Sequence, residues 1–158
     1  MKDDEFYKGV NDRAFTTLAT ATWAEATLQG LQEIWELPQG DYSWAAAGYS
    51  GAIGSGDTTC GLLIGTTIAI GLRHGQGKTS LPIDEADDRD KAIADVNEFY
   101  RDFMAEFGTA HCKQLISLDM SIPEEREQFR EKEVYKDTCF KFFQFVMKRF
   151  IERDKQGL

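Results

Sequence analysis

Apolar side chains recur at spacings of three and four residues in four parts of this chain, and this periodicity constrains the fold more than any other feature. The alternation of apolar and polar residues that is typical of strands is nearly absent. Helices are therefore expected over residues 15–35, from about 60 to 72, from the acidic residues 84–88 to 107, and from 123 to 153. The sequence predicts an all-α protein, a compact bundle of four to five helices.

The length and charge of the chain limit the classes of protein to which it can belong. With 158 residues it suits a single helical domain over residues 1–158. A net charge of −9 argues against a nucleic-acid partner, because phosphates require a basic surface. The longest apolar run, residues 60–72, is too short for a membrane span, and the charged N-terminus lacks the apolar core of a secretory signal. We expect a cytoplasmic protein, in a compartment that keeps thiols reduced.

A glycine-rich stretch precedes the first cysteine. Within residues 48–56, four glycines favour a tight loop over a helix. A capping residue among positions 57–59 is expected to start the next helix. Inside that helix, Gly61 and Gly65 share one face, where a neighbouring helix can approach closely. No strand precedes the stretch and no Lys-Ser or Lys-Thr pair follows it, so it is not a nucleotide-binding loop.

Three cysteines, Cys60, Cys112 and Cys139, belong to three different expected elements. No C-x-x-C pair occurs, so any shared site must be assembled by the fold. Free cysteines are often small buried apolar residues, and this alternative stays open. Cys60, however, is expected at a helix N-terminus, which stabilises a thiolate. The glycines around it leave backbone donors free to reach sulfur or an inorganic cluster, so Gly56 and Gly61 are candidate cofactor contacts.

The residues around the cysteines resemble a known family. The segments GSGDTTCGLLIG (residues 54–65) and EFGTAHC (residues 106–112), together with the isolated Cys139, are similar to the C_GCAxxG_C_C family of redox-active proteins. The resemblance extends from about residue 23 to residue 151, and it implies electron transfer or cluster binding by four cysteines. Here Leu62 replaces the alanine of the motif, and the first family cysteine is absent, because its expected position is at about Trp23.

Three hypotheses about function remain open. In the first, the chain is a redox protein in which Cys60, Cys112 and Cys139 bind an iron–sulfur cluster or another thiophilic metal and exchange electrons with a redox partner protein. His111 is then the candidate replacement for the missing ligand. In the second, two cysteines carry out thiol–disulfide exchange without a metal. In the third, the chain is a degenerate family member that acts as an interaction module.

The phenylalanines that follow Cys139 cover more than one face of the last expected helix. They must either fill a thick core or form an exposed aromatic stripe. An exposed stripe would indicate a homodimer.

Overall fold

The computed structural model describes residues 2–40 and 42–158, and the regular secondary structure of this part of the chain is helical except for one isolated β-bridge. Its long helices, of twelve residues or more, are α1 (Asp4–Thr17), α2 (Trp23–Ile34), α5 (Gly61–His74), α6 (Ala86–Phe107) and α9 (Phe140–Lys155). Short helices connect them: α3 (Tyr42–Ala47), α4 (Tyr49–Gly54), α7 (Cys112–Ile116) and α8 (Pro123–Glu131). The predicted all-α class is confirmed.

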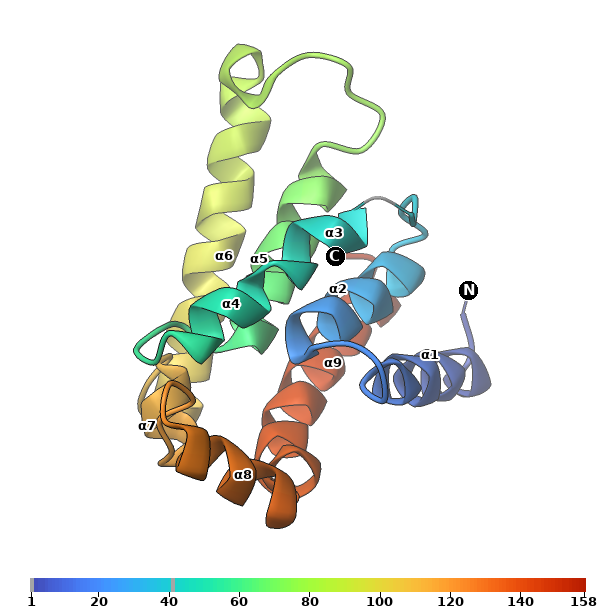
Figure 1. The fold of residues 1–158 in the computed structure, drawn as a ribbon. Coiled ribbons are helices and arrows are strands. Elements are labelled where there is room, and N and C mark those ends of the chain that lie inside the picture. The colour runs from blue at the N-terminus through green and yellow to red at the C-terminus, as the bar shows by residue number, and fades with distance from the viewer. Residues whose placement is uncertain (1, 41) are drawn as a thin grey trace.

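The long helices surround one apolar core. Figure 1 shows α5 between α6 and α2, with α9 beside α2 and α1 crossing at the outer side of α2. The short helices α7 and α8 lie together at one end of the bundle, close to the start of α5. The phenylalanines after Cys139 belong to the core: Phe142, Phe143 and Phe150 are buried, and their half-buried neighbours pack against it. They form no exposed aromatic stripe, so this argument for a homodimer does not hold.

The contact between α2 and α5 is close because two glycines of α5 face α2. A Cβ atom on Gly65 would lie 3.2 Å from the Cα atom of Ala24 and would overlap the carbonyl oxygen of the same residue. A Cβ atom on Gly61 would lie 3.5 Å from the backbone nitrogen of Ala24. The predicted close approach of a neighbouring helix is confirmed, and it places the first turn of α2 against the first turn of α5.

Several predicted boundaries are wrong. The helix expected over residues 15–35 is two helices, because Thr22 and Glu25 form a capping box that starts α2 anew. The glycine-rich stretch is not a loop, since α4 spans most of residues 48–56. Gly48, between α3 and α4, has a right-handed helical φ of −63°. The cost of glycine in a helix, about 1 kcal/mol, is small enough for packing and neighbouring alanines to outweigh it.

The start of α5 and the last expected helix also differ from the prediction. The N-cap of α5 is Cys60 itself, not a residue among 57–59. The chain from 123 to 153 is interrupted after α8, where Glu133 has a left-handed φ of 48°. A five-residue π-helical segment, Tyr135–Cys139, then leads into α9. No helix of the described residues is both long enough and apolar enough to cross a membrane.

Candidate functional site

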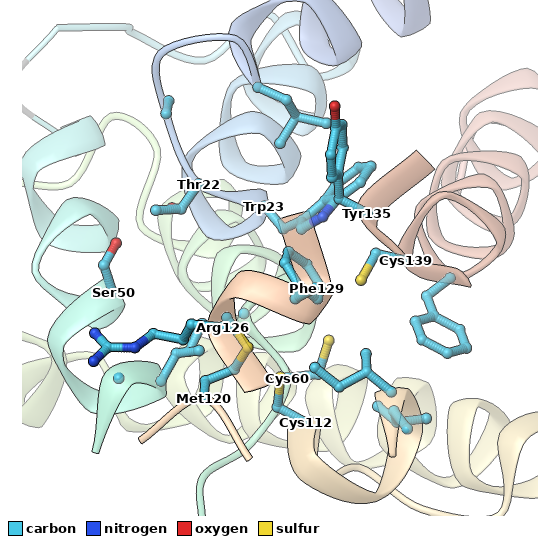
Figure 2. A pocket seen from close by; sticks show the side chains of 18 residues that line it. Thr22, Trp23, Ser50, Cys60, Cys112, Met120, Arg126, Phe129, Tyr135 and Cys139 are labelled. Carbon is cyan, nitrogen blue, oxygen red and sulfur yellow. The ribbon is translucent and has the colours of Figure 1, made fainter. Parts of the chain in front are cut away.

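All three cysteines line one pocket of about 420 Å³ at the end of the bundle where α7 and α8 lie (Figure 2). Cys60 precedes α5, Cys112 is the first residue of α7, and Cys139 ends the π-helical segment. Cys60 and Cys139 are buried, and Cys112 is half-buried. The fold therefore brings together three sulfur atoms that the sequence places in separate elements, and the rest of the lining is largely apolar.

A backbone pairing joins the segments of Cys60 and Cys112. Thr59 and His111 form an antiparallel bridge, in which the Cys60 N–H donates to the Ala110 carbonyl and the Cys112 N–H to the Thr58 carbonyl, both at 2.8 Å. Because neighbouring side chains of an extended segment point to opposite sides, Cys60 and Cys112 face the pocket together. The bridged residues between them face away from it.

This alternation explains the position of His111. Its Nδ1 atom lies 3.0 Å from Oδ1 of Asp57, and both side chains are exposed. His111 does not line the pocket, so the structure does not bring it together with the three cysteines. The proposed role of His111 as a metal ligand stays a prediction without support from its contacts.

Cys139 reaches the pocket through the π-helical segment. A π-turn holds one more residue than an α-turn, and each residue rotates the direction of the side chains by about 100°. The extra residue therefore turns the preceding part of the chain relative to α9, whereas Cys139, with helical φ and ψ, directly precedes α9 and shares the core-facing side of Phe142 and Phe143. Figure 2 shows the Cys139 sulfur directed toward the side of the pocket that holds Cys60 and Cys112.

Burial decides the protonation of the thiols. It raises the pKa of Cys60 from 9.0 to about 12, although the backbone N–H groups of Leu62 and Leu63 act in the opposite direction. Burial raises the pKa of Cys112 to about 11. Burial, and then the other two thiols, raise the pKa of Cys139. The helix N-terminus thus acts on Cys60 as predicted, but desolvation outweighs it, and all three sulfurs keep their protons at neutral pH.

These shifts give an expected dependence of stability on pH for the reduced, metal-free protein. A thiol whose pKa is higher in the folded state stabilises the fold below pH 9, and the stabilisation is lost as the pH rises through the folded value. The melting temperature should therefore fall between pH 9 and pH 11. Burial also raises the pKa of Tyr7 to about 12, and this gives a similar trend. The control is therefore the triple Cys→Ala variant, which keeps Tyr7. An equally steep fall in that variant would contradict the assignment to the cysteines.

The glycines differ in their relation to the pocket. Gly61 lines it, and a Cβ atom there would lie 3.2 Å from Cδ1 of Ile53. Gly56 does not line it. Its φ of +112° forms a turn against the Asp119 and Ser121 side chains, where a Cβ atom would lie 3.1 Å from Oδ1 of Asp119. The proposed cofactor contacts stay predictions: Gly61 lies at the pocket, whereas the contacts of Gly56 indicate a turn.

Trp23 lies where the resemblance expects the missing cysteine. It is the first residue of α2, is half-buried and lines the same pocket as the three cysteines. Its ring centroid lies 5.4 Å from that of Phe143 and 6.5 Å from that of Phe15. An aromatic side chain packed on the core therefore occupies the position that a fourth thiol would take.

Sequence reasoning missed several residues of the lining, above all Met120 and Arg126. Met120 precedes the helix expected over residues 123–153, and Arg126 lies in the highly charged first part of that helix. The one available signal was Phe129, an isolated aromatic in a charged run, which shares a helix face with Arg126 three residues earlier. Across residues 2–40 and 42–158, no group of three or more His, Cys, Asp or Glu side chains is arranged to hold a metal ion.

A helical bundle that gathers three cysteines from separate elements at one apolar pocket defines a small protein with a sulfur-based site. The chain belongs to the C_GCAxxG_C_C family: the family model described as "Putative redox-active protein (C_GCAxxG_C_C)" matches residues 23–152. This confirms the predicted family, and the match begins at Trp23. No curated protein and no solved structure matches the chain.

Proposed function

We propose that Cys60, Cys112 and Cys139 form one redox site and that this site binds an iron–sulfur cluster or another thiophilic metal ion. The observation that carries the proposal is the convergence of the three cysteines on one pocket, together with Cys60 and Cys112 aligned by a backbone bridge. Membership of a redox-active family supports it. The redox partner protein, and a cytoplasmic location that keeps the thiols reduced, are parts of the same proposal.

The chemistry of the donors supports such a group. Three thiols and the thioether of Met120 are soft ligands, which suit iron–sulfur clusters and other thiophilic metals. A bound cluster supplies one-electron transfer. The chain supplies the thiolates, gives up their protons on binding, and keeps water away with its apolar lining. With Trp23 at the fourth position, only three cysteines are available, so an ordinary four-cysteine cluster does not fit this chain.

A specific observation also favours the second candidate, thiol–disulfide exchange. Cys60 and Cys112 flank the bridged residues Thr59 and His111 and line the same pocket, whereas no three donors in the described part of the chain form a ready metal-binding group. In that reaction the two thiols lose two protons and two electrons and form a disulfide. A disulfide of the redox partner takes up the electrons and protons and becomes two thiols.

Metal analysis of protein purified without oxygen tests the proposal. We expect iron with acid-labile sulfide, or another thiophilic metal, in stoichiometric amounts, with a matching charge-transfer absorption. Cys60→Ser, Cys112→Ser and Cys139→Ser should each lower the metal content at least about tenfold, because each removes a direct ligand. His111→Gln is the matched control and should keep the metal, since His111 contacts Asp57.

Two other outcomes would overturn the metal-binding proposal. A colourless protein without iron, zinc or sulfide, both with and without oxygen, would contradict it. A reversible two-electron change that needs two of the cysteines would then establish thiol–disulfide exchange. If the triple Cys→Ala variant folds and binds a partner as the unmodified chain does, the cysteines are structural and the chain is an interaction module.

A further inference from the structure

Arg126 is the one charged side chain that lines the cysteine pocket in the part of the chain that the structure describes. The chain carries 27 acidic side chains and a net charge of −9, yet none of the acids is among the lining residues. Within residues 2–40 and 42–158 no carboxylate forms an ion pair with Arg126. Arg130, on the same helix, does pair, with Glu127. The pocket thus holds a cation that the fold leaves without an anionic partner.

The pocket has a cationic end and a sulfur end. Figure 2 shows the guanidinium group of Arg126 extending away from the three cysteine sulfurs, on the side of the pocket where Ser50 lies. In the view of Figure 2, Phe129, on the same face of α8, lies on the Arg126 side of the Cys139 sulfur, and Met120 lies between Arg126 and Cys60. Trp23 and Tyr135 add aromatic surface to the lining. A molecule that spans the pocket therefore contacts a cation at one end, apolar and aromatic side chains along its body, and thiols at the other end.

We propose that Arg126 selects small organic anions for this pocket, with a carboxylate or similar group on the guanidinium and an apolar body against the aromatic side chains. The inference rests on the proposed function only in taking the thiols as the reactive end of the pocket. A planar guanidinium binds a carboxylate through two parallel hydrogen bonds. A volume of about 420 Å³ suits a small molecule.

Because the whole chain is acidic, the positive charge of Arg126 matters for the approach of an anionic ligand. An acidic protein repels anions from its surface, so an anionic ligand needs local positive charge at the entrance to the reactive groups. Arg126 acts on the incoming molecule and not on the thiols, because burial and the neighbouring thiols account for the raised pKa values of the cysteines. Its removal should therefore change which reagents reach the sulfurs and leave the reactivity of the sulfurs unchanged.

Two disulfide reagents, one anionic and one neutral, test the inference on the reduced, metal-free chain of residues 1–158. The probes are 5,5′-dithiobis(2-nitrobenzoate), which carries two carboxylates, and neutral 4,4′-dithiodipyridine. With each, a cysteine sulfur gives its proton to solvent, attacks the disulfide of the reagent and forms a mixed disulfide, while the other half leaves as a coloured thiolate or thione. Arg126→Gln should lower the rate with the dicarboxylate about fivefold to tenfold and leave the rate with the neutral reagent unchanged.

Arg130→Gln is the matched control, since it removes the same charge from the same exposed helix without touching the pocket lining. It should leave both rates as they are, and added salt should reduce the preference of the unmodified chain for the dicarboxylate. The inference would be overturned if Arg126→Gln lowered the reaction rate equally with both reagents. It would also be overturned if both variants lowered the rate with the dicarboxylate equally. Because the reagents are applied to metal-free protein, this ratio does not depend on metal binding, and failure of the metal-binding proposal would be recognised separately.

Discussion

Replacing Gly65 with alanine is expected to lower the free energy of unfolding by about 3 kcal/mol, the upper part of the range for an overpacked core. A methyl group at this position would overlap the carbonyl oxygen of Ala24, and neither backbone can yield without separating α5 from α2. This loss exceeds the gain of about 1 kcal/mol that alanine brings inside a helix. Urea denaturation followed by circular dichroism measures the difference.

Gly71→Ala is the matched control for this prediction. Gly71 lies in the same helix, is exposed and has no atom within 4 Å of the added methyl group. There the substitution should raise the free energy of unfolding by about 0.5–1 kcal/mol. Equal stability of the two variants would show that the close approach of α2 and α5 does not depend on Gly65. The prediction also concerns the site, because this contact places Trp23, at the start of α2, beside the pocket.

The sequence was sufficient for those parts of the fold and site that depend on local pattern. The periodicity of α5 and α6 and the close approach at Gly61 and Gly65 follow from nearby residues. The order and sequence context of the cysteines were sufficient to identify the family. The convergence of the cysteines was expected only as a hypothesis, and it depends on the bridge between residues 59 and 111, which are far apart in the sequence.

The remaining features could not be predicted because tertiary contacts decide them. The glycine-rich segment forms α4 although glycine disfavours helices, and Glu133 interrupts the last expected helix with a positive φ. The thiol pKa values depend on burial, which has the opposite sign to the local effect of the helix N-terminus at Cys60. Arg126 was hidden in a run of charged residues, where nothing local distinguishes a side chain that lines a pocket from a solvated one.

Replacing Trp23 with cysteine is expected to slow the loss of a bound metal or cluster to a chelator about tenfold or more, because even partners outside the first ligand shell change metal affinity by that factor. The position is the first residue of α2 and lines the pocket with Cys60, Cys112 and Cys139. A thiol there would supply the fourth ligand that an ordinary cluster requires. Metal release followed by absorption, in protein prepared without oxygen, gives the rate.

Trp23→Ser separates the added ligand from the lost aromatic ring. Both variants remove the ring that packs against Phe143, so both should lose about 2 kcal/mol of stability, less than the cost for a fully buried tryptophan. Only the cysteine adds a sulfur donor. Slower release in Trp23→Cys than in both the serine variant and the unmodified chain would show that position 23 can complete the sulfur site. Equal release from the two variants would mean that a sulfur at position 23 does not reach the metal, and the three cysteines would then act without it.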